Sequence, residues 1–199
     1  MRVRPVNGAH VRQATPIGRS LRTYYGPGCA ERLDGFYPRF LAPGELGFDI
    51  GAHVGDRTAC WRRIGAEVVA VEPQPGLFRL LRILFGNDPG VVRVPSLVGS
   101  DVGRARLLLN SANLTVATAS TSFVAAAAGA PGWHDEVWDC AIDAPVTTLD
   151  ALAAAYGRPD FIKLDMRGSK RRRWPAWGRR RAACRSSSPR SNATWRPRA

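Results

Sequence analysis

Two parts of the sequence carry residue types that suit a nucleotide-like ligand. The apolar segment Leu46–Ile50 runs into a turn over residues 51–55, whose glycines permit positive φ and close approach of a ligand to the backbone. A helix after this turn would point its first N–H groups at such a ligand. Glu72 ends the next apolar segment, where a carboxylate can accept hydrogen bonds from ribose hydroxyls. We therefore predict a nucleoside-containing cofactor at the carboxyl ends of parallel strands.

A lysine and an acid end a later apolar segment, residues 160–165. Lys163 and Asp165 could form a structural ion pair, but a strand end at the ligand-binding edge favours a functional role. His134, beside Trp133, is either a base or a surface-loop residue, and the second interpretation is favoured.

Apolar and amphipathic segments alternate between these residues. Such alternation predicts βαβ units, and hence an α/β fold with a mostly parallel sheet. The Ser-, Thr-, Ala- and Gly-rich stretch 111–134 is left unassigned. We expect helices at 29–40, 56–64, 75–85 and from Thr147 (as N-cap) to Gly157, and strands at 46–50, 67–72, 91–94, 96–98, 105–110, 137–142 and 160–165.

The charge of the chain is concentrated near one end. The 199 residues carry a net charge of +13, yet residues 167–199 hold 12 of the 29 Lys and Arg residues and none of the 16 acids. The remaining chain is close to neutral. This tail lacks a recognisable nucleic-acid motif, so we expect it to be disordered rather than to bind nucleic acid.

The cysteine spacing and the absence of long apolar runs limit the cellular compartments in which we expect the protein. Cys29, Cys60, Cys140 and Cys184 form neither a zinc-knuckle spacing nor a C-x-x-C pair, which favours a reduced, cytoplasmic chain with no metal site. No apolar run approaches the ~20 residues of a membrane span, and no secretory signal is seen. We expect no membrane partner.

Four motifs in a fixed order resemble the FkbM-type S-adenosylmethionine-dependent methyltransferases. The resemblance covers about residues 20–166 and implies a Rossmann-like class I methyltransferase fold. It also implies S-adenosyl-L-methionine as cofactor and methyl transfer to a hydroxyl of a small molecule or glycan. The motifs are Phe48–Asp56, Val71-Glu72-Pro73, Val146–Asp150 and Phe161–Asp165.

The resemblance also implies roles for individual residues. Glu72 would hold the ribose hydroxyls, and Ser100 and Asp101 are weaker candidates near the adenine. Lys163 and Asp165 would border the sulfonium and the acceptor as the catalytic candidates. The loop under the methionine moiety would consist of Asp49, Gly51, Ala52, His53 and Gly55.

The sequence departs from the family after Asp165. The family continues with an apolar residue, Glu, Gly, any residue and Glu, whereas here Arg167 and Lys170 stand at the two glutamate positions. The chain has 27 Arg and 2 Lys, which indicates a GC-rich gene, and shifting plausible codons by two bases restores an apolar segment. We hypothesise that residues from about 167 onward are out of frame. The predicted organisation is a flexible basic N-terminus (1–19), a partial methyltransferase domain (20–166), incomplete at its C-terminal end, and an Arg-rich tail (167–199).

Two other functions remain as alternatives. An NAD-type dehydrogenase shares the strand–turn–helix arrangement, but Gly51 and Gly55 lack the Gly-x-Gly-x-x-Gly spacing of such enzymes. A non-catalytic protein that binds nucleic acid through its basic tail is the alternative from another class.

Overall fold

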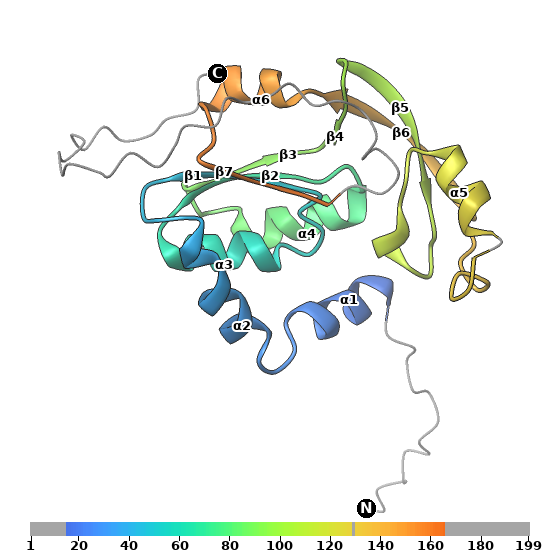
Figure 1. Cartoon of the computed structure of the whole chain (residues 1–199), viewed down its shortest axis with the longest axis horizontal. Coiled ribbons are helices and arrows are strands. Elements are labelled where there is room, and N and C mark those ends of the chain that lie inside the picture. The colour runs from blue at the N-terminus through green and yellow to red at the C-terminus, as the bar shows by residue number, and fades with distance from the viewer. Residues whose placement is uncertain (1–14, 129, 166–199) are drawn as a thin grey trace, which may run out of the picture.

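A computed structural model describes residues 15–128 and 130–165 of the chain (Figure 1). The predicted Arg-rich tail and the hypothesis that it is out of frame concern residues outside this described part.

A four-stranded parallel sheet forms the centre of the molecule. Its strands lie in the order β3-β2-β1-β7, and β1 pairs with both β2 and β7. Because all four run parallel, their carboxyl ends meet at one edge, as the alternating pattern predicts. The strands are β1 (Leu46–Ile50), β2 (Glu67–Val71), β3 (Val91–Val94) and β7 (Phe161–Leu164).

Helices cover both faces of this sheet (Figure 1). On one face, α3 (Asp56–Ile64) and α4 (Pro75–Phe85) bury a core centred on Trp61. On the other face, α6 (Leu149–Tyr156) packs on Phe48 and its neighbours. The architecture is α/β and Rossmann-like with a mostly parallel central sheet, as predicted.

A second, smaller sheet stands beside the first. It has the order β4-β6-β5, formed by β4 (Leu97–Val98), β5 (Gly103–Leu109) and β6 (Cys140–Thr147), and β5 runs antiparallel to β6. Between β5 and β6 the chain forms the 3₁₀ helix η2 (Leu114–Val116) and α5 (Thr121–Ala127).

Two sequence-based boundaries near β6 are wrong. The predicted strand 137–142 is displaced, because the pairing of β6 with β5 runs from Cys140 to Val146 and its pairing with β4 includes Thr147. The N-cap of α6 is therefore Thr148 and not Thr147, with the Thr148 hydroxyl accepting a hydrogen bond from Ala151 N at 3.0 Å.

Two helices precede the first strand. They are α1 (Pro16–Tyr24) and α2 (Cys29–Phe36), and α2 continues into the 3₁₀ helix η1 (Tyr37–Arg39). Thr15 caps α1, which begins four residues before the predicted domain start at residue 20. Within the described residues, no helix has the length and apolar character needed to span a bilayer.

Candidate functional site

A pocket of about 770 Å³ opens at the carboxyl ends of β1, β2 and β7. This volume falls in the range of small-molecule and cofactor sites. One side is formed by these strand ends and the turn after β1. Residues 114–122, here named the polar wall, form a further part of the lining. Its lining residues are Leu114, Thr115, Ala117, Thr118, Ala119, Ser120 and Ser122.

The turn after β1 needs glycine at position 51. Gly51 has a φ of +73°, and a Cβ there would lie 2.4 Å from the main-chain oxygen of Asp165. The main-chain N–H groups of Gly51 and Ala52 both donate to Val71 O, at 2.9 and 3.0 Å. The turn is thus fixed against the ends of β2 and β7, with its backbone beside the pocket.

Glu72 is a buried carboxylate on the pocket lining. Only 2% of its surface is exposed, and its oxygens accept hydrogen bonds from His53 N and Gln74 N, each at 2.9 Å. Burial raises the pKa of Glu72 to about 7, although these two N–H donors oppose the rise. A carboxylate so oriented can accept further hydrogen bonds from ligand hydroxyls.

The imidazole of His53 also lines the pocket. Its Nε2 lies 3.4 Å from Ser20 Oγ, and its ring meets the Tyr24 ring edge-on with centroids 5.1 Å apart. Burial, with the nearby charge of Lys163, lowers the pKa of His53 to about 4, so the ring is neutral at neutral pH. His53 therefore contributes both a main-chain donor to Glu72 and a side chain to the pocket.

Lys163 joins β7 to the turn after β1. Its Nζ donates to Gly51 O at 2.8 Å and lies 3.3 Å from Asp49 Oδ1. Asp49 is fully buried, and its other oxygen accepts a hydrogen bond from Thr58 Oγ1 at 2.8 Å. The ammonium group thus compensates a buried charge and at the same time holds a carbonyl of the turn.

Asp165 stands at the pocket mouth. Its carboxylate is 63% exposed and lies 3.7 Å from Lys163 Nζ. Ser100 and Asp101 lie at the pocket too, both exposed, and Ser100 Oγ donates to Asp101 Oδ2 at 2.6 Å.

The structure brings most of the predicted site residues together. Those on the pocket lining are Gly51, His53, Glu72, Ser100, Asp101, Lys163 and Asp165. Asp49, Ala52 and Gly55 do not line the pocket. All three are away from the lining: Asp49 and Ala52 are buried, and a Cβ on Gly55 would collide with Phe85 and Leu81 of α4. His134 is exposed and is not among the lining residues.

Other lining residues are absent from the sequence-based prediction. Tyr24, Arg57 and Gln74 all line the pocket. Arg57 pairs with Asp56 at 3.0 Å and lies over the Tyr24 ring, 5.9 Å from its centroid. The polar character of stretch 111–134 was the one available signal for the polar wall, but composition alone does not place it at the pocket.

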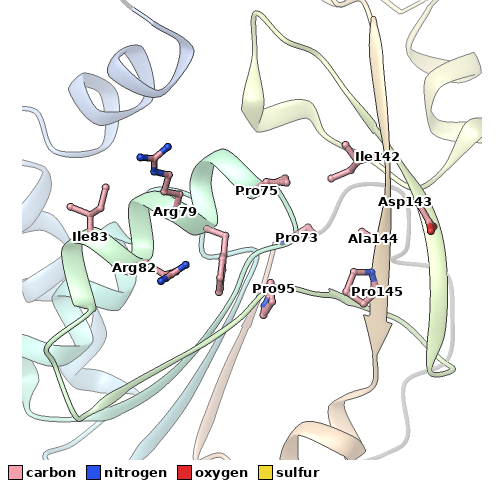
Figure 2. Close-up of a pocket in the computed structure, with 11 residues that line it drawn as sticks. Pro73, Pro75, Arg79, Arg82, Ile83, Pro95, Ile142, Asp143, Ala144 and Pro145 are labelled. Atoms are coloured by element: carbon pink, nitrogen blue, oxygen red, sulfur yellow. The ribbon is translucent and has the colours of Figure 1, made fainter.

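A second hollow of about 710 Å³ lies between α4 and β6 (Figure 2). Pro73 and Pro75 line it at the β2–α4 turn, with Ile142 and Pro145 of β6 on the other side. Apart from Pro73 it shares no lining residue with the first pocket, and it contains none of the ten predicted site residues. The chemistry is therefore assigned to the first pocket. Residues 15–128 and 130–165 contain no group of three or more His, Cys, Asp or Glu placed to hold a metal ion.

Comparison with known proteins identifies the family. Curated proteins gave no match. The X-ray structure of YjhP from E. coli is similar, with 12% identity and a TM-score of 0.31 over 73% of this chain. The chain covers 66% of YjhP, slightly less than two thirds of its length. The family model of the methyltransferase FkbM domain matches residues 49–169, which is more than half of the chain. The chain belongs to the FkbM methyltransferase family.

Proposed function

We propose that the chain is an S-adenosylmethionine-dependent methyltransferase that methylates a hydroxyl group of a small molecule or glycan. The observation that carries the proposal is the buried Glu72 carboxylate beside the glycine turn, in a pocket of a family whose members transfer methyl groups. Hydroxylated ligands suit the polar wall, which presents Thr115, Thr118 and Ser120 to the same pocket.

The residues present fit this cofactor. Glu72 would accept hydrogen bonds from the two ribose hydroxyls, and the backbone of the turn from Gly51 to His53 would lie under the methionine part. Ser100 and Asp101 would border the adenine. When bound, the cofactor supplies a methyl group on a positively charged sulfur. The negative charge of Glu72, ionised above about pH 7, favours such a cation.

Asp165 is the candidate to take the proton of the acceptor hydroxyl. Its exposed carboxylate stands at the pocket mouth, where an acceptor can reach it. Lys163 is better suited to hold Asp49 and the turn than to react, since its Nζ already contacts Gly51 O and Asp49. We therefore assign Asp165 a catalytic role and Lys163 a positioning role.

Calorimetric titration of the full chain with S-adenosylhomocysteine tests the cofactor assignment. We expect one molecule bound per chain, and a folded chain that binds none would contradict the proposal. Titration with duplex DNA at two salt concentrations tests the nucleic-acid alternative, which predicts salt-dependent binding.

Asp165→Asn tests the catalytic assignment. The amide cannot accept the proton, so methyl transfer from labelled S-adenosylmethionine to a hydroxylated acceptor should fall about 10²- to 10⁴-fold. Binding of S-adenosylhomocysteine should stay within about threefold. Unchanged turnover would remove Asp165 from this role.

A further inference from the structure

The polar wall is held in place by side chains of distant elements. Three alternate carbonyl oxygens, two at its start and one just before it, each accept one side-chain hydrogen bond. The donors come from α1, from the β2–α4 turn and from the segment before β6. The pairs are Arg19 to Ala112 O, Gln74 Nε2 to Leu114 O at 3.0 Å and Trp138 Nε1 to Val116 O at 3.0 Å.

Gln74 also contacts Glu72. Its main-chain N–H donates to Glu72 Oε1 at 2.9 Å, while its side-chain amide reaches Leu114 O. The residue is buried, with 7% of its surface exposed. One residue therefore contacts the ribose-side acid through its backbone and the polar wall through its side chain.

The backbone around Gln74 is stiff. Proline stands on both sides, and Figure 2 shows Pro73 and Pro75 at this turn. Pro73 and Pro75 each have a fixed φ, and a residue before proline is restricted to extended conformations, as found for Gln74 at φ −75° and ψ 120°. Gln74 is also the N-cap residue of α4, yet its side chain makes no capping hydrogen bond and is directed to Leu114 instead.

We propose that Gln74 is a positioning residue that couples occupancy of Glu72 to the order of the polar wall. The inference rests on the proposed function, because it requires a ribose at Glu72. Because the backbone around Gln74 is stiff, Glu72 and Gln74 move together as one unit. Ribose hydroxyls bound to the Glu72 carboxylate restrict the motion of this unit relative to the polar wall, which keeps the Gln74 amide on Leu114 O. The acceptor then binds to a wall that the cofactor has already ordered, so its binding loses less conformational entropy. Cofactor and acceptor therefore bind with positive coupling.

Hydrogen-exchange mass spectrometry on the full chain tests the coupling. With saturating S-adenosylhomocysteine, wild-type amides in residues 112–118 should exchange about 2- to 10-fold more slowly, the range that one neutral hydrogen bond supports. Gln74→Met keeps the main-chain donor to Glu72 and removes the side-chain donor. Each protein is saturated with S-adenosylhomocysteine at a concentration set by its own titration, and in Gln74→Met the slowing at 112–118 should be lost.

Trp138→Phe is the matched control. It removes the donor to Val116 O, on the same wall, but leaves the connection to Glu72 intact. Ligand-dependent slowing should persist in this variant. If Gln74→Met does not fold, Gln74→Ala replaces it, since a methyl side chain carries no donor for Leu114 O.

The outcomes separate this inference from the proposed function. Ligand binding without slower exchange at 112–118 in the wild type, or with equal slowing in the Gln74 variant, overturns the coupling alone. A wild-type chain that binds no S-adenosylhomocysteine overturns the proposed function and the coupling with it.

Discussion

Replacing Lys163 with methionine should strongly destabilise the fold. Methionine keeps the unbranched stem but removes the ammonium group 3.3 Å from Asp49 Oδ1 and 2.8 Å from Gly51 O. Asp49 is fully buried, and its other carboxylate oxygen accepts a hydrogen bond from Thr58 Oγ1. Removing one partner of a buried ion pair lowers the free energy of unfolding by about 3–5 kcal/mol, because the other charge stays buried without compensation. At this chain length 3 kcal/mol corresponds to a fall in Tm of roughly 6–12 °C.

Urea unfolding followed by circular dichroism measures this loss. The double variant Asp49→Asn, Lys163→Met removes the buried charge as well, so it should recover a large part of the lost stability. Arg63→Met is the matched control, since the Arg63–Asp34 pair is nearly half exposed on both sides and should contribute less than about 1 kcal/mol. A loss below about 1 kcal/mol for Lys163→Met, or no recovery in the double variant, would refute the account of Lys163.

Two further predictions concern the pocket itself. Binding of S-adenosylhomocysteine should weaken as the pH falls from 8 to 6, because burial raises the pKa of Glu72 to about 7 and protonation removes an acceptor for ribose; tighter binding at pH 6 would contradict this. The same raised pKa makes the contribution of Glu72 to the free energy of unfolding greatest below pH 4.5, the ordinary Glu value. This contribution is lost as the pH rises from 4.5 to 7. Glu72→Gln should abolish this pH dependence when unfolding is measured across the range. Gly51→Ala should lower the free energy of unfolding in urea by at least about 2 kcal/mol, since it combines positive φ with a Cβ 2.4 Å from Asp165 O. Gly44→Ala, at φ +75° with open space around it, should show only the cost of positive φ. Equal losses of stability in the two variants would refute the close contact at Gly51.

The central sheet and the glycine turn could be predicted from the sequence because their signals are local. Apolar runs of strand length alternate with helical periodicity, and Gly51 and Glu72 follow strands directly. Parallel pairing then brings the ends of β1, β2 and β7 to one edge. Local pattern and topology agree here, so residues more than a hundred positions apart could be placed together.

The second sheet was less predictable because its pairing is non-local. Asp143 and Pro145 are poor strand residues, so the sequence pattern ends the strand at Ile142. In the structure, Asp143 pairs with Arg104 across the sheet, and β6 continues through Pro145 beside β5 and β4. Tertiary pairing overrides local propensity there.

The place of the polar wall at the pocket, and the side chains that hydrogen-bond to it, could not be predicted from the sequence. Gln74 carries no periodic or motif signal, and its role arises because its side chain reaches Leu114, 40 positions away. Tyr24 likewise reaches the pocket only through the packing of α1 beside His53. Such contacts depend on how separate elements pack, which residue spacing does not encode.

Titration of the full chain and of its Glu72→Ala variant with S-adenosylhomocysteine is the decisive experiment for the cofactor site. We expect saturable binding of one molecule per wild-type chain at pH 8, and at least about tenfold weaker binding in the variant, in which the ribose loses its charged acceptor. A folded wild-type chain that shows no binding, or a Glu72→Ala variant that binds equally well, would contradict the cofactor assignment.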